Sequence, residues 1–200
     1  MTDRSGLFID GQWRTPAEHS AVFDKYLRTP ACEVGIASEM DVADAVAAAE
    51  RGATAPLPPA ERHDVLTRAA DLLLARQDAV LAAYVTETGF TQADARGELE
   101  RTASVLRLCA GEALRLAGEE IPVAATPGSE NRLAFTMRIP VGVVAAVAPF
   151  NAPLSTVAHK IGPAIAAGNG VVLKPAEQTP LSSIALVEAF TDAGLPAGFL

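Results

Sequence analysis

The chain has 200 residues, of which half are apolar, and its formal net charge at neutral pH is −8. This composition can bury the core of one or two domains, and the negative charge disfavours nucleic acid or an anionic membrane surface as a partner. No apolar run is long enough to cross a bilayer, and the N-terminal Met-Thr-Asp-Arg-Ser lacks the apolar core of a signal peptide. We therefore expect a cytoplasmic protein.

The N-terminal segments carry strong local signals. In residues 7–13, an Asp-Gly pair flanked by apolar residues predicts a β-hairpin. Ser38 and Asp41 form the pattern of a capping box and predict a helix that ends at Gly52. The face of this helix that we expect to be apolar consists of Val42, Ala45, Val46 and Ala49.

Two further helices are predicted next. Prolines 56, 58 and 59 break the chain before a long amphipathic helix over about 60–87, which Gly89 closes. Thr91 and Asp94 offer a second capping box, for a helix that reaches about residue 117. Apolar residues then alternate with small or polar ones over 133–139, which predicts a half-buried strand at an edge or in an arm.

The C-terminal third predicts a β-α-β-α unit. The apolar run 141–147 is typical of a strand buried on both faces, and Asn151 has the position of an N-cap with Pro153 in the first helical turn. The helix ends at Gly168, and its expected buried face consists of Leu154, Val157, Ala158, Ile161 and Ile165.

A second strand over 171–174 and a second helix over 180–193 complete the unit. The intervening Gly168-Asn169-Gly170 is not a phosphate-binding loop, because it precedes a strand instead of following one into a helix. The chain also lacks a GxGxxG pattern.

Several segments, taken together and in order, resemble the aldehyde dehydrogenase superfamily. The segments are Phe8–Trp13, Glu87–Gly89, Ala110–Ala113, Pro149–Pro153, Gly162–Asn169 and Val171–Leu181. The resemblance implies an α/β fold with a partial Rossmann-type NAD-binding domain, N-terminal helices and a β arm. It also implies that the nucleophilic Cys and the general-base Glu lie beyond Leu200, because family members are more than twice this length.

The same resemblance divides the chain into three parts and implies a homo-oligomeric full-length enzyme. Residues 1–120 hold the N-terminal hairpin and the helical part of the cofactor-binding domain. Residues 121–139 are an extended arm, and residues 140–200 begin the NAD-binding sheet. The catalytic domain is absent from these 200 residues, so we predict that they do not oxidise aldehydes by themselves.

Asn151 is the expected catalytic residue. In the resembling family the corresponding amide donates to the aldehyde oxygen, which becomes an oxyanion when a thiolate attacks the carbonyl. The remaining steps are hydride transfer to NAD, a thioester intermediate and hydrolysis to a carboxylic acid. By the same resemblance, Ala148, Pro149, Phe150 and Asn151 line the nicotinamide side of the cofactor.

The ribose side of the cofactor is assigned to residues 174–177 by the resemblance. Lys174 and Glu177 are expected to hydrogen-bond the adenosine ribose, with Pro175 and Ala176 between them. A carboxylate at Glu177 favours NAD, since the 2′-phosphate of NADP would meet a like charge. NADP remains possible.

The cysteines and histidines are interpreted as structural. Cys109 lies at helical spacing with Leu106 and Ala113, which is typical of a buried thiol, and no CxxC or Cys/His cluster includes Cys32. His19, His63 and His159 have no second ligand at supporting spacing, so no metal site is predicted.

Two alternatives stay open. The parent enzyme could pass its acyl group to coenzyme A instead of water. The chain could instead be a non-catalytic remnant that binds a nucleotide or a partner subunit, with an exposed strand edge on a sheet of only two parallel strands.

Overall fold

The computed structural model describes residues 6–55 and 57–200, so Pro56 and the N-terminal Met-Thr-Asp-Arg-Ser lie outside the described part. The chain contains both helices and strands, which alternate only in the C-terminal β-α-β-α unit, and the α/β class is confirmed. The first elements are the strands β1 (Leu7–Ile9), β2 (Gln12–Arg14), β3 (Glu18–Phe23) and β4 (Pro30–Ile36), followed by the helices α1 (Glu39–Thr54), α2 (Pro59–Ala75), α3 (Gln77–Thr88) and α4 (Gln92–Ala113).

The later elements begin with a thin arm and end in the β-α-β-α unit. They are β5 (Glu120–Ile121), a 3₁₀ turn η1 (Val123–Ala125), β6 (Ala134–Phe135), β7 (Val143–Val147), α5 (Ser155–Ala166), β8 (Gly170–Lys174) and α6 (Leu181–Asp192). Strands β7 and β8 pair in parallel, with Val143 opposite Gly170 and Val147 opposite Lys174.

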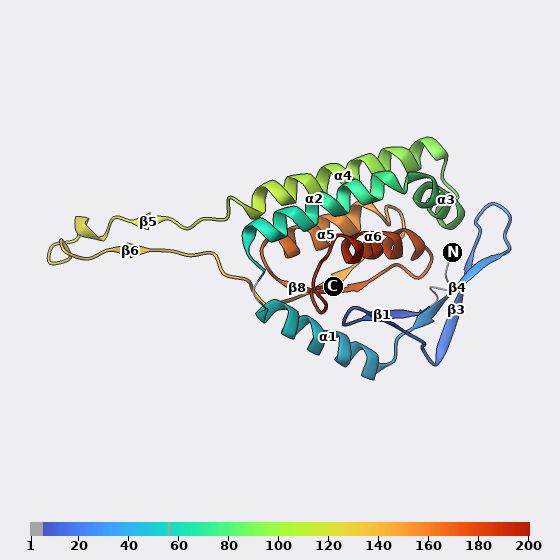
Figure 1. Cartoon of the computed structure of the whole chain (residues 1–200), viewed down its shortest axis with the longest axis horizontal. Helices are drawn as coiled ribbons and strands as arrows, with labels where there is room; N and C mark the ends of the chain where they lie inside the picture. The colour runs from blue at the N-terminus through green and yellow to red at the C-terminus, as the bar shows by residue number, and fades with distance from the viewer. Residues whose placement is uncertain (1–5, 56) are drawn as a thin grey trace.

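The molecule is layered around the β7–β8 pair (Figure 1). Helices α5 and α6 lie on one side of the strands, and α2 and α4 cover them from outside, whereas α1 contacts the opposite side. The face predicted for the helix after Asn151 is buried throughout: Leu154, Val157, Ala158, Ile161 and Ile165 are all fully covered. Burial of a Leu, Ile or Val side chain stabilises the fold by about 1.5–3 kcal/mol.

Helix α1 packs closely against β8, and a glycine permits the contact. A Cβ added at Gly170 would lie 2.2 Å from the carbonyl oxygen of Ala49, so only glycine lets the helix backbone approach the strand this closely. This contact covers the start of β8 and leaves the later residues of the strand less buried.

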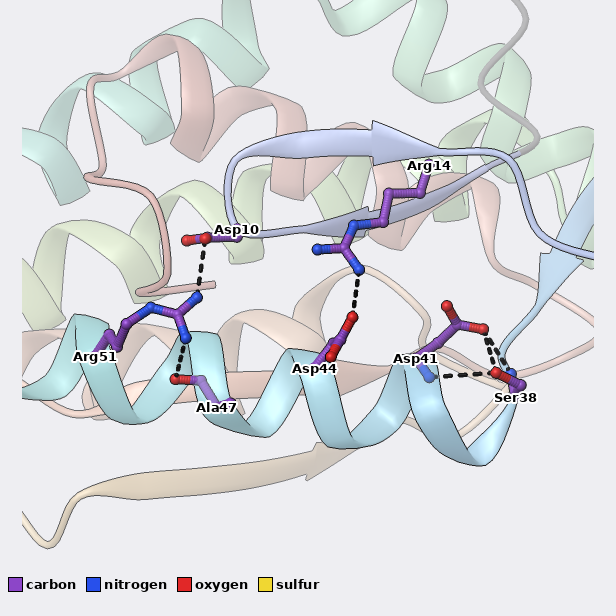
Figure 2. Close-up of polar contacts among 7 residues, drawn as sticks. All are labelled: Asp10, Arg14, Ser38, Asp41, Asp44, Ala47 and Arg51. Atoms are coloured by element: carbon purple, nitrogen blue, oxygen red, sulfur yellow. Dashed lines mark hydrogen bonds and ion pairs between the residues drawn. The ribbon is translucent and has the colours of Figure 1, made fainter.

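The β1–β2 hairpin confirms the Asp-Gly signal and lies on α1 (Figure 2). Asp10 and Gly11 both have positive φ, as a tight two-residue turn requires. Arg14 forms an ion pair with Asp44 at 2.7 Å, and Asp10 forms one with Arg51 at 2.9 Å. The side chains in both pairs are largely exposed, so each pair adds little stability.

Both predicted capping boxes are confirmed. Ser38 caps α1 together with Asp41, as Figure 2 shows, and Thr91 caps α4 together with Asp94. Gly89 closes α3 in the left-handed conformation, and Gly168 has positive φ after α5, so both predicted stops are confirmed as well.

Four boundaries predicted from the sequence are wrong. Helix α1 runs to Thr54 and so passes its predicted end at Gly52. The single helix over 60–87 is two helices, because the chain turns at Arg76, where φ is −101° and ψ is 18°. Helix α4 ends at Ala113 and does not reach residue 117. The strand predicted over 133–139 is regular only at β6, where it pairs with β5 in the projecting arm.

Two burial predictions are also wrong. On the arm, Leu133, Phe135, Met137 and Ile139 are 62–76% exposed, because no other described element packs on them.

Strand β7 is covered mainly on the face of Val144 and Ala146, whereas Ala145 and Val147 are exposed. Helix α1 reaches β7 at few points, which explains the open face. Val141, placed in the strand by the sequence, lies before it and is exposed.

Candidate functional site

The loop from Ala148 to Leu154 joins the carboxyl end of β7 to α5, and it carries Asn151. In open α/β sheets, ligands bind at this end of parallel strands. The Ala148 N–H donates to the Lys174 carbonyl at 3.0 Å, which joins the end of β7 to the end of β8. The two groups of predicted cofactor residues, 148–151 and 174–177, are therefore neighbours at one edge of the sheet.

Asn151 is not the N-cap of α5, which corrects the sequence prediction. The helix begins at Ser155, its N-cap position is Leu154, and no side chain of the N-cap residue bonds to the helix. Pro153 precedes the helix by two residues, and a proline disfavours the helical conformation in the residue before it. The Asn151 side chain is exposed and has no hydrogen-bond partner among the described residues.

A distant glutamate takes the capping role at α5. Glu98 of α4 is only 6% exposed, and its Oε1 accepts hydrogen bonds from the backbone N–H of Ser155 at 2.9 Å and from its hydroxyl at 2.7 Å. The other carboxylate oxygen lies 3.4 Å from the guanidinium of Arg101. Glu98 therefore satisfies the first backbone donor of α5.

Helix α6 is capped in the same way, since its N-cap position is Pro180, whose side chain cannot accept a hydrogen bond. Glu87 of α3 is fully buried and accepts from the backbone N–H groups of Leu181, at 2.6 Å, and Ser182, at 2.9 Å. The Ser182 hydroxyl donates to the same carboxyl group. Burial raises the pKa of Glu87 to about 7, although these hydrogen bonds and the charge of Lys25 act in the opposite direction.

Two residues near the start of α6 also hold the loop that carries Asn151. Thr179 donates from its hydroxyl to the carbonyl of Phe150 at 3.3 Å, and Ser183 donates to the carbonyl of Pro153 at 3.2 Å. Both hydroxyl-bearing residues are buried. The backbone on each side of Asn151 is thus fixed, while its side chain forms no hydrogen bond to a described residue.

Residues 174–177 line a groove of about 750 Å³ that runs beside β8. The groove is bounded by α1, the β1–β2 hairpin, β4 and the first turns of α6. Its volume lies within the range of ordinary small-molecule sites. Lys174 Nζ lies 3.3 Å from Glu177 Oε1, and both side chains are mostly exposed, so both can reach a ligand. Residues 148–151 do not line this groove.

Neither cysteine is poised as a nucleophile. Burial raises the pKa of Cys109, and the carboxylate of Glu112 adds to the shift. Burial and the charge of Glu87 raise the pKa of Cys32. Both thiols are therefore held in the protonated, less reactive form.

The histidines are not assembled into a metal-binding cluster. His63 Nδ1 lies 3.0 Å from the carbonyl oxygen of Ala110, a contact that joins α2 to α4. Within residues 6–55 and 57–200, no group of three or more His, Cys, Asp or Glu side chains is arranged to hold a metal ion. No helix in the same residues is long and apolar enough to cross a membrane.

The sequence prediction missed the capping function of Glu87 and Glu98, although a signal was present. Both glutamates stand on helical faces that are otherwise apolar: Glu87 follows Val80 and Tyr84 at helical spacing, and Glu98 lies between Ala95 and Leu99. A carboxylate on a buried face must find hydrogen-bond donors. Its partner could not be inferred from local spacing, because Ser155 lies 57 residues beyond Glu98.

A β-α-β-α unit with polar side chains at the carboxyl ends of parallel strands is the arrangement in which α/β domains commonly bind ligands. Residues 13–200 match the aldehyde dehydrogenase family, and the chain belongs to this family. The 3-sulfolactaldehyde dehydrogenase of Priestia aryabhattai is 50% identical over 195 residues, which are 98% of this chain and 41% of that protein.

Solved structures agree with the family assignment. Aldehyde dehydrogenase 21 from Physcomitrella patens, in complex with the reaction product succinate, superposes with a TM-score of 0.93 at 34% identity, over 97% of this chain and 41% of that one. The NADP-dependent glyceraldehyde-3-phosphate dehydrogenase from Bacillus halodurans C-125, complexed with NADP, gives 0.91 at 35% identity, over 98% and 42%. The chain spans about two fifths of the length of these relatives.

Proposed function

We propose that this chain is the cofactor-binding part of an NAD-dependent aldehyde dehydrogenase that oxidises a short aldehyde with an anionic group. The observation that carries the proposal is the state of Asn151. Its backbone is fixed through Phe150 and Pro153, and its amide, at the carboxyl end of β7, bonds to none of the residues in the described part of the chain. The division into residues 1–120, 121–139 and 140–200 belongs to the same proposal.

Asn151 suits the stabilisation of an oxyanion. Its amide donates without a formal charge, so it binds the developing negative charge of the transition state better than the neutral carbonyl of the substrate. The fixed loop keeps the donor oriented before the reaction, which lowers the cost of reorganisation. By the family resemblance, the nucleophile that creates the oxyanion is expected in another part of the enzyme. The raised pKa values of Cys32 and Cys109 fit that expectation, because they disfavour the thiolate form in either residue.

The residues at the end of β8 fit a dinucleotide. Lys174 and Glu177 stand at the groove with exposed side chains that can donate to and accept from ribose hydroxyls. The carboxylate of Glu177 opposes a 2′-phosphate, whereas the ammonium of Lys174 attracts one, so we expect NAD to be preferred without NADP being excluded. Residues 148–151 would approach the nicotinamide end. When bound, the cofactor supplies the hydride acceptor.

The three relatives described above favour an anionic substrate. Their names specify an aldehyde with a sulfonate, a product with two carboxylates and an aldehyde with a phosphate. The shared chemistry is a short aldehyde whose far end is negatively charged. The sulfonated aldehyde is the first to test, because that relative is 50% identical to this chain.

Steady-state kinetics of the protein as its host cell expresses it would test this function. We expect NAD reduction with 3-sulfolactaldehyde, and a fall in kcat of about 100- to 1,000-fold in Asn151→Ala. His159→Ala, on the exposed side of α5, is the matched control and should retain wild-type kcat. Unchanged kcat in Asn151→Ala would contradict the role of this residue.

Product analysis tests the hydrolytic step. A free carboxylic acid formed without coenzyme A supports hydrolysis, and a reaction that depends on coenzyme A would identify the acylating alternative. Saturable NAD binding without turnover of any aldehyde would support the non-catalytic alternative. A preference for NADP over NAD, unchanged in Glu177→Gln, would contradict the cofactor assignment.

A further inference from the structure

Two glutamates outside the reacting groups hold the parts of the candidate site in place. We propose that Glu98 and Glu87 are positioning residues, and that Glu98 orients the Asn151 loop while Glu87 orients the α6 end of the site. The proposal rests on the proposed function for its kinetic effects. Its structural part stands on the contacts alone.

Helix α5 depends on Glu98 for the cap at Ser155. The N-cap residue of α5 is Leu154, which has no side-chain acceptor. The Thr156 N–H donates to the Ala152 carbonyl at 3.2 Å, so the donor that needs a partner from another element is the N–H of Ser155. Glu98 supplies one to Ser155, and its carboxylate is also favoured by the positive end of the helix dipole. Because Glu98 is 6% exposed, water cannot easily replace it.

With Glu98 as the cap of α5, the Asn151 side chain is not needed as a capping group. Asn151 is the polar residue of the loop that the sequence itself offers as an N-cap, yet its amide bonds to no described residue. Glu98 supplies the acceptor at Ser155, so the start of α5 is capped without the Asn151 side chain. An oxyanion donor requires this combination of a fixed backbone and a free amide.

Glu87 is linked to both halves of the candidate site, which are the Asn151 loop and the segment 174–177. Glu87 holds the backbone of Leu181 and Ser182 at the start of α6. The residues on either side, Thr179 and Ser183, hold the Asn151 loop through its carbonyls. The segment 174–177 leads directly into this turn, so a shift of α6 moves the candidate ribose-binding residues as well.

The two roles predict different kinetic changes. Loss of Glu98 should misplace Asn151 alone, and should lower kcat by about 10- to 100-fold while the KM for NAD changes less than about 3-fold. Loss of Glu87 should raise the KM for NAD and also lower kcat, because α6 contacts both loops. A purely stabilising cap would lower the unfolding temperature and leave both constants unchanged at temperatures where the variant is folded.

The experiment compares variants of the protein as its host cell expresses it, each assayed well below its own unfolding temperature. Glu98→Ala should lose kcat, and Glu98→Gln should recover most of it, because the Gln oxygen can still accept from Ser155. Glu100→Ala, an exposed neighbour on α4, is the matched control and should behave as wild type. Wild-type kcat in folded Glu98→Ala would overturn the proposal.

Hydrogen exchange supplies a measurement that does not need activity. In Glu98→Ala, the backbone amides over 150–156 should exchange at least about 10-fold faster than in wild type, while those of β8 stay unchanged. If wild type oxidises no aldehyde, the proposed function fails, and the exchange rates still decide the positioning role. Unchanged exchange in this segment would overturn that role even in an active enzyme.

A milder variant covers the case in which Glu98→Ala does not fold. Ser155→Ala removes only the hydroxyl contact and keeps the backbone N–H bond to Glu98. It should give a smaller change in the same direction, with faster exchange over 150–156 and a kcat reduced by about 3-fold. Wild-type exchange and wild-type kcat in Ser155→Ala would then count against the proposal.

Discussion

Helices α1 and α4 begin very differently from helices α5 and α6. The first pair is capped by exposed side chains three residues apart, Ser38 with Asp41 and Thr91 with Asp94. The second pair is capped by buried glutamates that lie 57 and 94 or 95 residues away in sequence. Local caps stabilise the helix that carries them, whereas distant caps fix the position of one helix against another.

The two kinds of cap also differ in their electrostatics. Hydrogen bonds from Ser38 and Thr91 hold the pKa values of Asp41 and Asp94 below their ordinary range. Burial acts in the opposite direction on Glu87 and raises its pKa. The Glu87 cap and the two capping-box aspartates are therefore shifted in opposite directions, because burial dominates at Glu87 and hydrogen bonds dominate at Asp41 and Asp94.

The largest expected effect comes from removing a distant cap. Glu98→Ala leaves the N–H and hydroxyl of Ser155 buried without an acceptor, and each such donor costs roughly 1–3 kcal/mol. We expect the free energy of unfolding, measured by urea denaturation, to fall by about 4 kcal/mol. In the exposed control Glu100→Ala the change should stay below about 0.5 kcal/mol. Equal losses in the two variants would remove the distinction between buried caps and surface residues.

The free energy of unfolding should fall as the pH rises from 4.5 to 7, because Glu87 is buried. The pKa of Glu87 rises from 4.5 to about 7 on folding, so its contribution to stability is fully present below pH 4.5 and is lost as the pH rises through 7. One pKa unit corresponds to about 1.4 kcal/mol, which gives a loss of about 3 kcal/mol across this window.

The Glu87→Gln variant cannot ionise and serves as the reference for this measurement. Denaturation curves of wild type and Glu87→Gln at several pH values should converge, or reverse their order, between pH 4.5 and 7. A stability difference that is independent of pH would contradict the prediction, because it would show that Glu87 has the same pKa in the folded and unfolded states.

Removal of a local cap should lower the free energy of unfolding less than removal of a distant cap. Thr91→Ala removes the acceptor for the N–H of Asp94, and loss of an N-cap side chain costs about 1 kcal/mol. Thr91→Ser retains the hydroxyl and should restore most of this stability. Because Thr91 is remote from the Asn151 loop, kcat should remain at the wild-type value in both variants; a kcat lowered as far as in Glu98→Ala would break the comparison.

The smallest effect is expected at the surface contact between the hairpin and α1. Asp44→Asn breaks the ion pair with Arg14, in which both side chains are about half exposed. Such pairs contribute roughly 0–1 kcal/mol, and we expect a loss below about 0.5 kcal/mol that disappears at high salt. A loss above 1 kcal/mol would show that this pair fixes the position of the hairpin.

Local chemistry explains which parts of the fold could be predicted from the sequence. The hairpin at Asp10-Gly11, the two capping boxes and the stops at Gly89 and Gly168 each depend on residues within a few positions of one another. The break at Arg76 was missed because no glycine or proline marks it. Its cause is the packing of α2 and α3 on other helices, which local sequence does not encode.

The candidate site was predictable only in part. The positions of Asn151 and Lys174 at the ends of two strands follow from the β-α-β-α pattern, and the structure places these strand ends side by side. The N-cap assignment of Asn151 was wrong because the acceptor for α5 comes from Glu98 on another helix. The roles of residues 148–151 and 174–177 remain predictions until ligand binding is measured.

The projecting arm makes one part of the chain a natural place for engineering. Strands β5 and β6 pair only at Glu120–Phe135 and Ile121–Ala134, and a turn near its far end is closed by the N–H of Ser129 and the carbonyl of Thr126. Lengthening such a loop twofold costs only about 0.6 kcal/mol in closure entropy. A fluorescent label or an affinity tag inserted at residues 126–129 would therefore report on this protein from a distance, without disturbing either buried cap.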